Sequence, residues 1–108
     1  MLEFKFVKFE VFIPEEYVEQ LRKCINEIGA AKIGKYDNCT SYYTVNGTWR
    51  PLEGSKPFEG TINRVEHSKE IKVEFRARKD LIEKVIKEIK RIHPYEEPVY
   101  NIVPLLNK

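Results

Sequence analysis

The chain has 108 residues, of which 42% are apolar and 33% are charged, a composition typical of a single globular domain spanning residues 1–108. Its 19 basic and 17 acidic side chains leave a net charge of +2, too little to attract nucleic acid or an anionic membrane surface, so neither is expected as a partner. The first residues are charged, which argues against a signal peptide, and no apolar run approaches the ~20 residues of a membrane span. We therefore expect a cytoplasmic protein.

The first part of the chain predicts a strand followed by a helix. Apolar and charged residues alternate over residues 3–13, which is the period of a strand. The second face of this strand also carries apolar side chains, namely Phe4, Phe6 and Phe12. Pro14 suits the first position of a helix, whose apolar residues recur at helical spacing until Gly29 supplies a C-terminal stop.

A second strand and a long loop are predicted next. Residues 40–50 are rich in Thr, Tyr, Val and Trp, which favour strands. Asn46-Gly47 lies inside this segment and predicts a tight turn or a bulge. Residues 51–60 contain prolines and glycines and predict a loop whose length is typical of functional or mobile segments.

The last part of the chain predicts a strand, a helix and a final strand. Alternation of apolar and charged residues marks a strand at 70–77. Apolar residues at helical spacing predict a helix over 81–92, with Asp80 and Glu83 as its capping box. Apolar residues between 99 and 105 predict a last strand, whose register the pattern leaves open.

The resulting order, β-α-β-β-α-β, predicts an α+β fold of the ferredoxin-like kind. In this sandwich two helices cover one face of a four-stranded antiparallel sheet. The opposite face would expose the three phenylalanines and the tyrosines of the second strand, which is more apolar surface than a monomer usually shows. We therefore predict that the chain oligomerises through that face.

The most conspicuous motif lies between the second helix and the last strand. Two prolines constrain His93, Tyr95, Glu96 and Glu97 within a short turn. Imidazole and carboxylate groups suit a divalent metal ion, with His93 and Glu97 as the candidate ligands. The alternative is architectural: the histidine responds to the helix dipole, the tyrosine packs and the glutamates accept backbone hydrogen bonds. The signal by itself favours the architectural interpretation.

Two further clusters are candidates for binding. Tyr36, Asp37 and Cys39 follow the first helix and combine a phenol, a carboxylate and a thiol, although a turn with a packed cysteine explains them better. Arg50, which follows a tryptophan, precedes the predicted loop, and Glu53 lies within it. The arginine has the chemistry to stack on a ring or to grip an anion, and an Arg–Glu pair is an equally good explanation.

Three motifs occur in this order along the chain: Ile33-Gly34-Lys35-Tyr36-Asp37-Asn38-Cys39, Gly47-Thr48-Trp49-Arg50-Pro51-Leu52-Glu53-Gly54, and His93-Pro94-Tyr95-Glu96-Glu97-Pro98-Val99-Tyr100. Together they resemble the inserted domain of YqfO-type proteins in the Nif-three-like family (NGG-one-interacting factor three), here standing alone. That module is related in fold to the PII and CutA proteins, which form trimers. The resemblance therefore implies a PII/CutA-like fold and a trimer. It also implies that the second-to-third strand connection contacts ligands and partners, as in PII proteins.

The resemblance transfers no catalytic residue, because the dimetal site of the full-length relatives lies in flanking segments that this sequence lacks. Our leading hypothesis is a non-enzymatic, oligomeric module with a regulatory or accessory role, which binds a small ligand, a metal ion or a partner protein. The candidate surface joins the turn at 36–39, the loop at 50–60 and the turn at 93–97. Both turns follow helix C-termini, which predicts that they lie on one side of the domain.

Two alternatives remain open. The first is a metal-dependent enzyme that uses His93, Glu96 and Glu97, with Cys39 as a further ligand of a divalent ion. The second is a purely structural trimerisation module.

Overall fold

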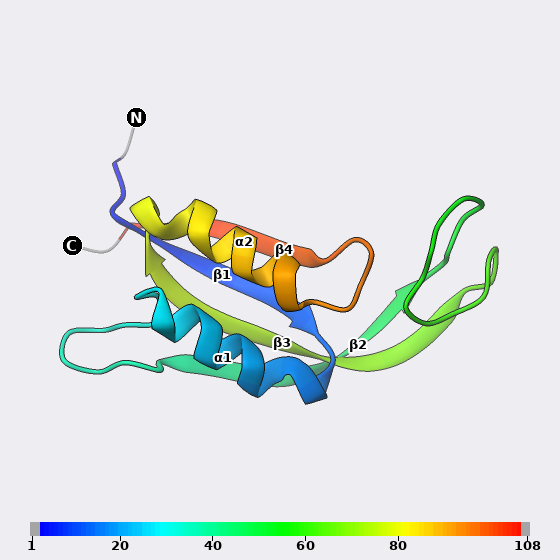
Figure 1. Cartoon of the computed structure of the whole chain (residues 1–108), viewed down its shortest axis with the longest axis horizontal. Coiled ribbons are helices and arrows are strands. Elements are labelled where there is room, and N and C mark those ends of the chain that lie inside the picture. The colour runs from blue at the N-terminus through cyan, green and yellow to red at the C-terminus, as the bar shows by residue number, and fades with distance from the viewer. Residues whose placement is uncertain (1–2, 107–108) are drawn as a thin grey trace.

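The computed structural model describes residues 3–106 and has four strands and two helices. In chain order the elements are β1 (Phe6–Ile13), α1 (Val18–Glu27), β2 (Thr40–Trp49), β3 (Glu66–Arg78), α2 (Ile82–Ile92) and β4 (Val99–Leu105). The strands form one sheet in the order β2-β3-β1-β4, and every neighbouring pair is antiparallel. Both helices lie on the same face of this sheet (Figure 1). The predicted ferredoxin-like fold is confirmed.

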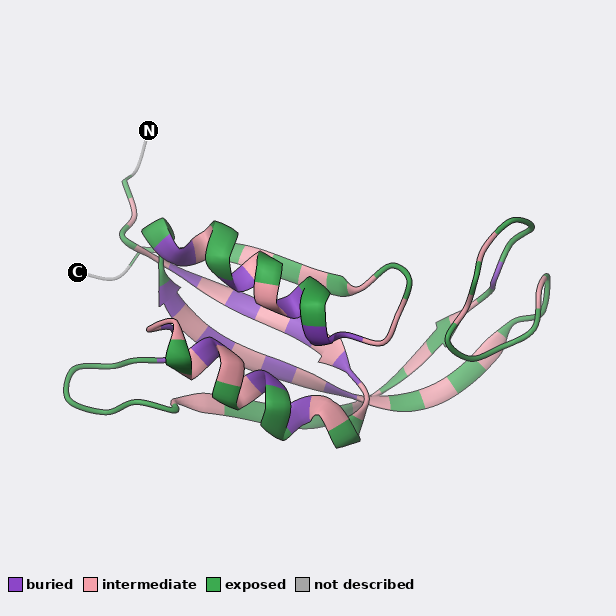
Figure 2. Cartoon of the chain, viewed as in Figure 1, coloured by how far each residue is buried: buried purple, intermediate pink, exposed green. Residues whose placement is uncertain are grey.

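The core lies between the helices and the sheet, as Figure 2 shows by the buried residues there. Every second residue of β1 is buried, beginning with Val7, because side chains of a strand alternate between its faces. Phe9 of β1 stacks on Phe75 of β3 with ring centroids 5.2 Å apart. The helices close the core with apolar side chains that recur at helical spacing, and the buried ones are Val18, Leu21 and Ile25 of α1 and Val85, Ile89 and Ile92 of α2.

The predicted capping box at the start of α2 is wrong. Each helix is preceded by a short 3-10 turn, at Glu15–Tyr17 and Lys79–Leu81, and neither α1 nor α2 has a side-chain cap. The carboxylate of Asp80 instead accepts a hydrogen bond from Arg78 Nε at 3.0 Å. Asp80 lies within the 3-10 turn itself and not at the N-cap of α2, which is Leu81.

The prediction of a turn or bulge at Asn46-Gly47 is also wrong, because β2 pairs with β3 without interruption through these residues. A Cβ atom on Gly47 would lie 3.2 Å from Glu70 Oε1. The glycine thus gives room to a neighbouring carboxylate, a use of glycine that does not require a turn.

The β2–β3 pair extends beyond the rest of the sheet. β1 pairs with β3 only from Ile71 onward, so residues 45–49 of β2 and 66–70 of β3 form a two-stranded ribbon. This ribbon and the loop at its end project from the rest of the domain (Figure 1). The domain, ribbon included, measures 46 Å along its longest axis and 22 Å along its shortest. The third strand is therefore longer than predicted.

The open face of the sheet is less apolar than predicted. Phe6 and Phe12 are only partly exposed, and Arg76 and Lys72 lie over their rings at 4.8 and 5.5 Å from the centroids. Tyr43 shares this face, since Lys72 also lies over its ring at 5.8 Å. The remaining members of the predicted patch lie elsewhere: Phe4 packs against the core, and Tyr42 pairs with the buried Val73 and so faces the other way.

Candidate functional site

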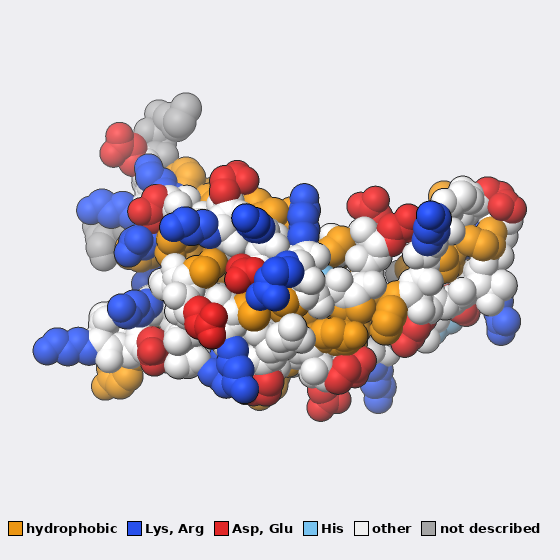
Figure 3. All heavy atoms as spheres, viewed as in Figure 1, with side chains coloured by type: hydrophobic (Ala, Val, Ile, Leu, Met, Phe, Trp, Pro, Cys, Tyr) orange, Lys and Arg blue, Asp and Glu red, His pale blue; other side chains and the backbone are white. Residues whose placement is uncertain are grey.

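A cleft of about 410 Å³ lies between the loop that follows β2 and the turn that leads into β4. The walls come from both segments and from the ends of β2 and β3. Its lining residues are Thr48, Trp49, Arg50, Pro51, Leu52, Ser55, Pro57, Phe58, Glu59, Glu70, Tyr95, Glu96, Glu97 and Val99. The space-filling view shows acidic and apolar side chains side by side in this part of the molecule (Figure 3). Two of the three sequence motifs thus meet at one cleft.

Direct contacts hold the loop against the turn. The backbone N–H of Lys56 donates to Glu96 Oε1 at 2.8 Å, across 40 residues of sequence. The rings of Phe58 and Tyr95 pack with centroids 5.9 Å apart. Glu96 therefore accepts a backbone hydrogen bond, as the architectural interpretation of the turn predicts, but its donor lies on the other wall of the cleft.

Tyr95 ties the turn to the ribbon. Its hydroxyl donates to Glu70 Oε2 at 3.3 Å. Burial raises the pKa of Glu70, and the hydrogen bond from Tyr95 only partly opposes this. Burial, followed by the nearby negative charge of Glu70, raises the pKa of Tyr95 to about 12. The phenol therefore stays protonated at neutral pH and remains a hydrogen-bond donor to the carboxylate.

His93 supports the turn from beneath and does not line the cleft. Only 7% of its surface is exposed. Its Nε2–H donates to the carbonyl oxygen of Phe12 at 2.6 Å, and its Nδ1 accepts the backbone N–H of Tyr95 at 3.2 Å. Both ring nitrogens are used, which requires the neutral tautomer with its proton on Nε2. Burial lowers the pKa of His93 in agreement with this.

The geometry offers the predicted metal site no support. Both nitrogens of His93 are engaged by the backbone, so neither is free to bind an ion without breaking a hydrogen bond. Within residues 3–106 no three His, Cys, Asp or Glu side chains lie close enough together to hold a metal ion. Metal binding by His93 and Glu97 remains an untested prediction.

The turn at 36–39 lies at the opposite end of the domain, which corrects the prediction that both turns share one side (Figure 1). The two helices run in opposite directions along the sheet, so their C-termini point to opposite ends. Asp37 and Cys39 help to build this turn: Asp37 Oδ1 accepts from Asn38 Nδ2 at 3.0 Å, and the Cys39 N–H donates to Ala31 O at 2.8 Å. Tyr36 projects from it with 76% of its surface exposed.

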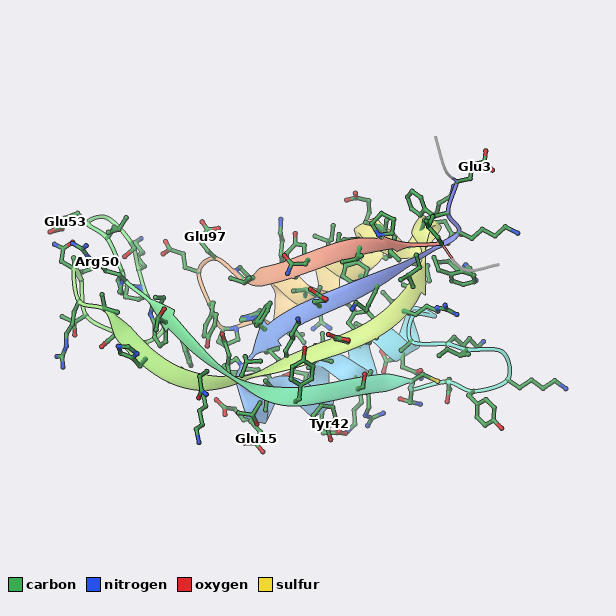
Figure 4. All side chains as sticks on the ribbon, turned by 180° about the vertical axis from the view of Figure 1, so that it is seen from behind. Glu3, Glu15, Tyr42, Arg50, Glu53 and Glu97 are labelled. Carbon is green, nitrogen blue, oxygen red and sulfur yellow. The ribbon has the colours of Figure 1, made fainter. Side chains whose placement is uncertain are left out.

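The predicted Arg50–Glu53 pair does not form within the described part of the chain, where no hydrogen bond or ion pair joins the two side chains. Arg50 lines the cleft but Glu53 does not. Figure 4 shows both at the far end of the projecting loop, with Glu97 on the turn that faces it.

Three cleft residues were not predicted individually: Phe58 and Glu59, which belong to the predicted loop at 50–60, and Glu70, which lies outside the predicted surface. Phe58 and Glu59 lie in a loop whose path no periodicity predicts. Glu70 belongs to a strand whose alternation assigned it an ordinary outward position. A large apolar side chain in a polar loop was the available signal, because such residues usually pack against something.

The chain has clear relatives among curated proteins. It is 37% identical over 101 residues to the GTP cyclohydrolase 1 type 2 homolog of Halalkalibacterium halodurans, a match that covers 94% of this chain and 27% of that protein. The protein of the same name from Bacillus subtilis is 37% identical over 98 residues, covering 91% of this chain and 26% of the relative. The chain thus spans about a quarter of the length of these relatives.

A solved structure of a Bacillus cereus protein related to NIF3 agrees with the chain over its full length. The TM-score is 0.84 at 34% identity, and the match covers 100% of this chain and 28% of that one. This chain is a homologue of one segment of the NIF3-related proteins. The predicted resemblance to a module of YqfO-type proteins is thereby confirmed.

The NIF3-related segment also shares its fold with smaller proteins. The periplasmic divalent cation tolerance protein CutA of Archaeoglobus fulgidus matches with a TM-score of 0.72 at 19% identity, over 95% of this chain and 86% of that one. Bacillus subtilis GlnK matches with a TM-score of 0.67 at 15% identity, over 96% and 88%. At these identities the likeness shows the fold alone.

No protein-family model matches the chain, and no helix within residues 3–106 is long and apolar enough to cross a membrane.

Proposed function

We propose that the chain is a non-enzymatic, oligomeric PII/CutA-like module, with a regulatory or accessory role, that binds a small ligand in the cleft. The observation that carries this proposal is the cleft of about 410 Å³ at which two sequence motifs meet. Its volume falls within the range of roughly 300–1,000 Å³ typical of small-molecule sites. Half of its lining residues are apolar or aromatic and half are polar or charged, so the cleft offers both apolar surface and groups that can orient a ligand.

The arrangement suits binding better than catalysis. Glu96 and Glu70 each accept a hydrogen bond from the protein itself, and His93 is engaged through both nitrogens. A nucleophilic or acid–base mechanism that used these three groups would first have to break the hydrogen bonds that hold them. A metal-dependent enzyme with His93, Glu96, Glu97 and Cys39 as ligands is the weaker alternative, since the segment between α1 and β2, which contains Cys39, lies at the opposite end of the domain from the turn between α2 and β4 (Figure 1).

We further propose a trimer that assembles through the open face of the sheet. The CutA-like and PII-like fold supports this, as do the aromatic rings of Phe6, Phe12 and Tyr43 on that face. Val99 pairs with Phe12, and Glu70 lies two residues before Lys72 on β3, so both cleft residues belong to the same side of the sheet. Assembly and ligand binding would therefore influence one another, which is what a regulatory module requires.

Filling the cleft tests the binding proposal. Val99→Trp places an indole at a cleft-lining, exposed position of β4, while Val65→Trp makes the same change at an exposed position just before β3 that does not line the cleft. A thermal-shift screen of common metabolites should find a compound that stabilises the wild type and Val65→Trp but not Val99→Trp. Equal stabilisation of all three proteins would place the ligand elsewhere. The absence of any stabilising compound would favour a purely structural trimerisation module.

Sedimentation velocity at micromolar concentration tests the assembly, and a monomer would contradict it.

Metal analysis of the purified protein tests the enzyme alternative. Stoichiometric metal that is lost in His93→Ala would favour that alternative, whereas no metal in either protein would leave His93 with its architectural role.

A further inference from the structure

The cleft carries a strong excess of negative charge. Its lining contains four carboxylates and one guanidinium, a formal charge of −3 at neutral pH, and it contains no lysine or histidine. The carboxylates are Glu59, Glu70, Glu96 and Glu97, and the guanidinium is that of Arg50. The chain as a whole has a net charge of +2, so the acidity belongs to this site and not to the protein generally. Such a site disfavours phosphates and carboxylates as ligands.

Two of these carboxylates are free to meet a ligand. Glu96 and Glu70 are occupied by Lys56 N–H and the Tyr95 hydroxyl. The side chains of Glu59 and Glu97 make no hydrogen bond or ion pair with any residue in the range 3–106, and both are exposed. Glu59 lies on the loop and Glu97 on the turn, so the free negative charges come from both walls of the cleft.

The remaining walls suit the apolar part of a cation. Trp49, Phe58 and Tyr95 contribute aromatic rings, and 46% of the Phe58 surface is exposed although its ring packs on Tyr95. Trp49 Nε1–H donates to the backbone oxygen of Glu59 at 3.4 Å, which anchors the indole to the loop. Aromatic faces attract organic ammonium groups as well as apolar surface.

We infer that the cleft binds a small organic cation, an amine or guanidinium compound with an apolar body, held between Glu59 and Glu97 against the aromatic walls. This inference rests on the proposed function, because it names the ligand class of the same site. This inference distinguishes the cleft from an anion-binding site, in which basic side chains would point inward and outnumber the acidic ones.

Three probes with the same apolar body and different charge test the ligand class: 2-phenylethylamine, 2-phenylethanol and phenylacetate. Titration calorimetry of each probe into the full chain should show that the amine binds most tightly, the alcohol more weakly and the carboxylate weakest of all. Raising the salt concentration should weaken the amine and leave the alcohol nearly unchanged, because salt screens only the charged interaction.

Matched variants locate the interaction. Glu97→Gln keeps the shape of the side chain and should weaken amine binding by about two- to fivefold, the effect of losing one solvent-accessible charge pair. Glu53→Gln removes a carboxylate from the same loop region outside the cleft lining and should change nothing. Arg50→Gln should strengthen amine binding, a change opposite in sign to that expected of an anion site.

The outcomes distinguish failure of the cation inference from failure of the binding proposal. If phenylacetate or phenylethanol binds more tightly than the amine, and Val99→Trp abolishes that binding, the cleft is a ligand site but the cation inference is wrong. If Val99→Trp and Glu97→Gln both bind the amine as tightly as the wild type does, the cation inference is also wrong. If no probe binds at millimolar concentration while a metabolite that is neither an amine nor a guanidinium compound binds in the thermal-shift screen, the cation inference is wrong and the binding proposal stands. If nothing binds at all, both proposals fail.

Discussion

The turn after α1 and the cleft, at opposite ends of the domain, use their hydrogen bonds in different ways. At the end of α1, side chains of Asn26, Asp37 and Asn38 bond to one another and to the backbone, and Arg22 also donates to Asn38. These bonds close the turn on itself. At the other end, the Lys56 N–H to Glu96 and Tyr95 to Glu70 bonds join two segments far apart in sequence and leave a cleft between them.

The difference shows that residue types alone do not mark a site. Both ends carry a tyrosine, carboxylates and nearby glycines, yet the turn at 33–39 is a small hairpin in which Ile33 and Tyr36 exchange both backbone hydrogen bonds at 2.9 Å. Its carboxylate is used for architecture. The cleft end keeps two carboxylates free because its contacts are made by other groups.

The largest expected effect comes from His93→Ala, which removes the support beneath the cleft. It leaves the carbonyl of Phe12 and the N–H of Tyr95 without partners and empties a buried volume. We expect a loss of about 2–4 kcal/mol in the free energy of unfolding. Urea denaturation measures it, with His67→Ala, at an exposed position on β3, as the control. A loss below that of the control would contradict the role assigned to His93.

Acid should weaken the same support, to a smaller extent than deletion. Burial lowers the pKa of His93 in the folded state, so the unfolded chain takes up this proton more readily. The His93 contribution is therefore complete above the unfolded pKa of about 6.5 and is lost as the pH falls below it. Urea midpoints of the wild type should decrease from pH 7.5 to pH 5.5 more steeply than those of His93→Ala. Parallel slopes would show that another group is responsible.

At the opposite end, Asn38→Ala should cost about 1–2 kcal/mol, because it removes several hydrogen bonds and places alanine in a left-handed conformation. Asn38 has a φ of 54°. Asn38→Gly keeps that conformation available and isolates the hydrogen-bond contribution, so it should be less destabilising than alanine. Neither variant should alter binding in the cleft. A change in amine affinity would mean that the two ends are coupled.

Glu96→Ala should loosen the cleft with little effect on the whole domain. It removes the acceptor of the Lys56 N–H, a bond worth about 1 kcal/mol locally. Amide hydrogen exchange should become faster over residues 52–58, whereas exchange in β1 should stay unchanged. Faster exchange throughout the sheet would show that the loop contributes to global stability.

The smallest effect is expected for Tyr36→Ala, which we predict to change stability by less than about 0.5 kcal/mol, because the side chain is largely exposed. Sedimentation velocity on the same variant is the more informative measurement. A lower oligomeric state would identify the hairpin as part of an interface and would remove the contrast between a closed turn and an open cleft.

Much of the fold was predictable because its signals are local. Alternation in β1, helical spacing in α1 and α2, and the order of the elements suffice for the ferredoxin-like topology. The errors are instructive: Asn46-Gly47 has the residues of a hairpin turn, but pairing with β3 on either side holds it in a strand. Asp80 has the spacing of a capping box, but a 3-10 turn moved the helix start past it.

The site was predictable only in part. The motifs around Arg50 and His93 were recognised as candidates, and the structure brings Arg50, Tyr95, Glu96 and Glu97 to one cleft. The prediction that the motif with Tyr36 lies on the same side is wrong, and the predicted topology already argues against it. In a ferredoxin-like sheet β1 and β3 are antiparallel neighbours, so the helices that follow them run in opposite directions and their C-termini lie at opposite ends of the domain.

The elements, their order and the relationship to NIF3-related proteins follow from periodicity and motifs, because these are properties of neighbouring residues. Which glutamates remain free, and the role of His93 in holding the turn without lining the cleft, follow from the three-dimensional packing alone. Those outcomes depend on contacts such as Lys56 to Glu96 and His93 to Phe12, which span 40 and 81 residues. A local pattern carries no information about such partners, and here they separate the residues that build the cleft from those available to bind.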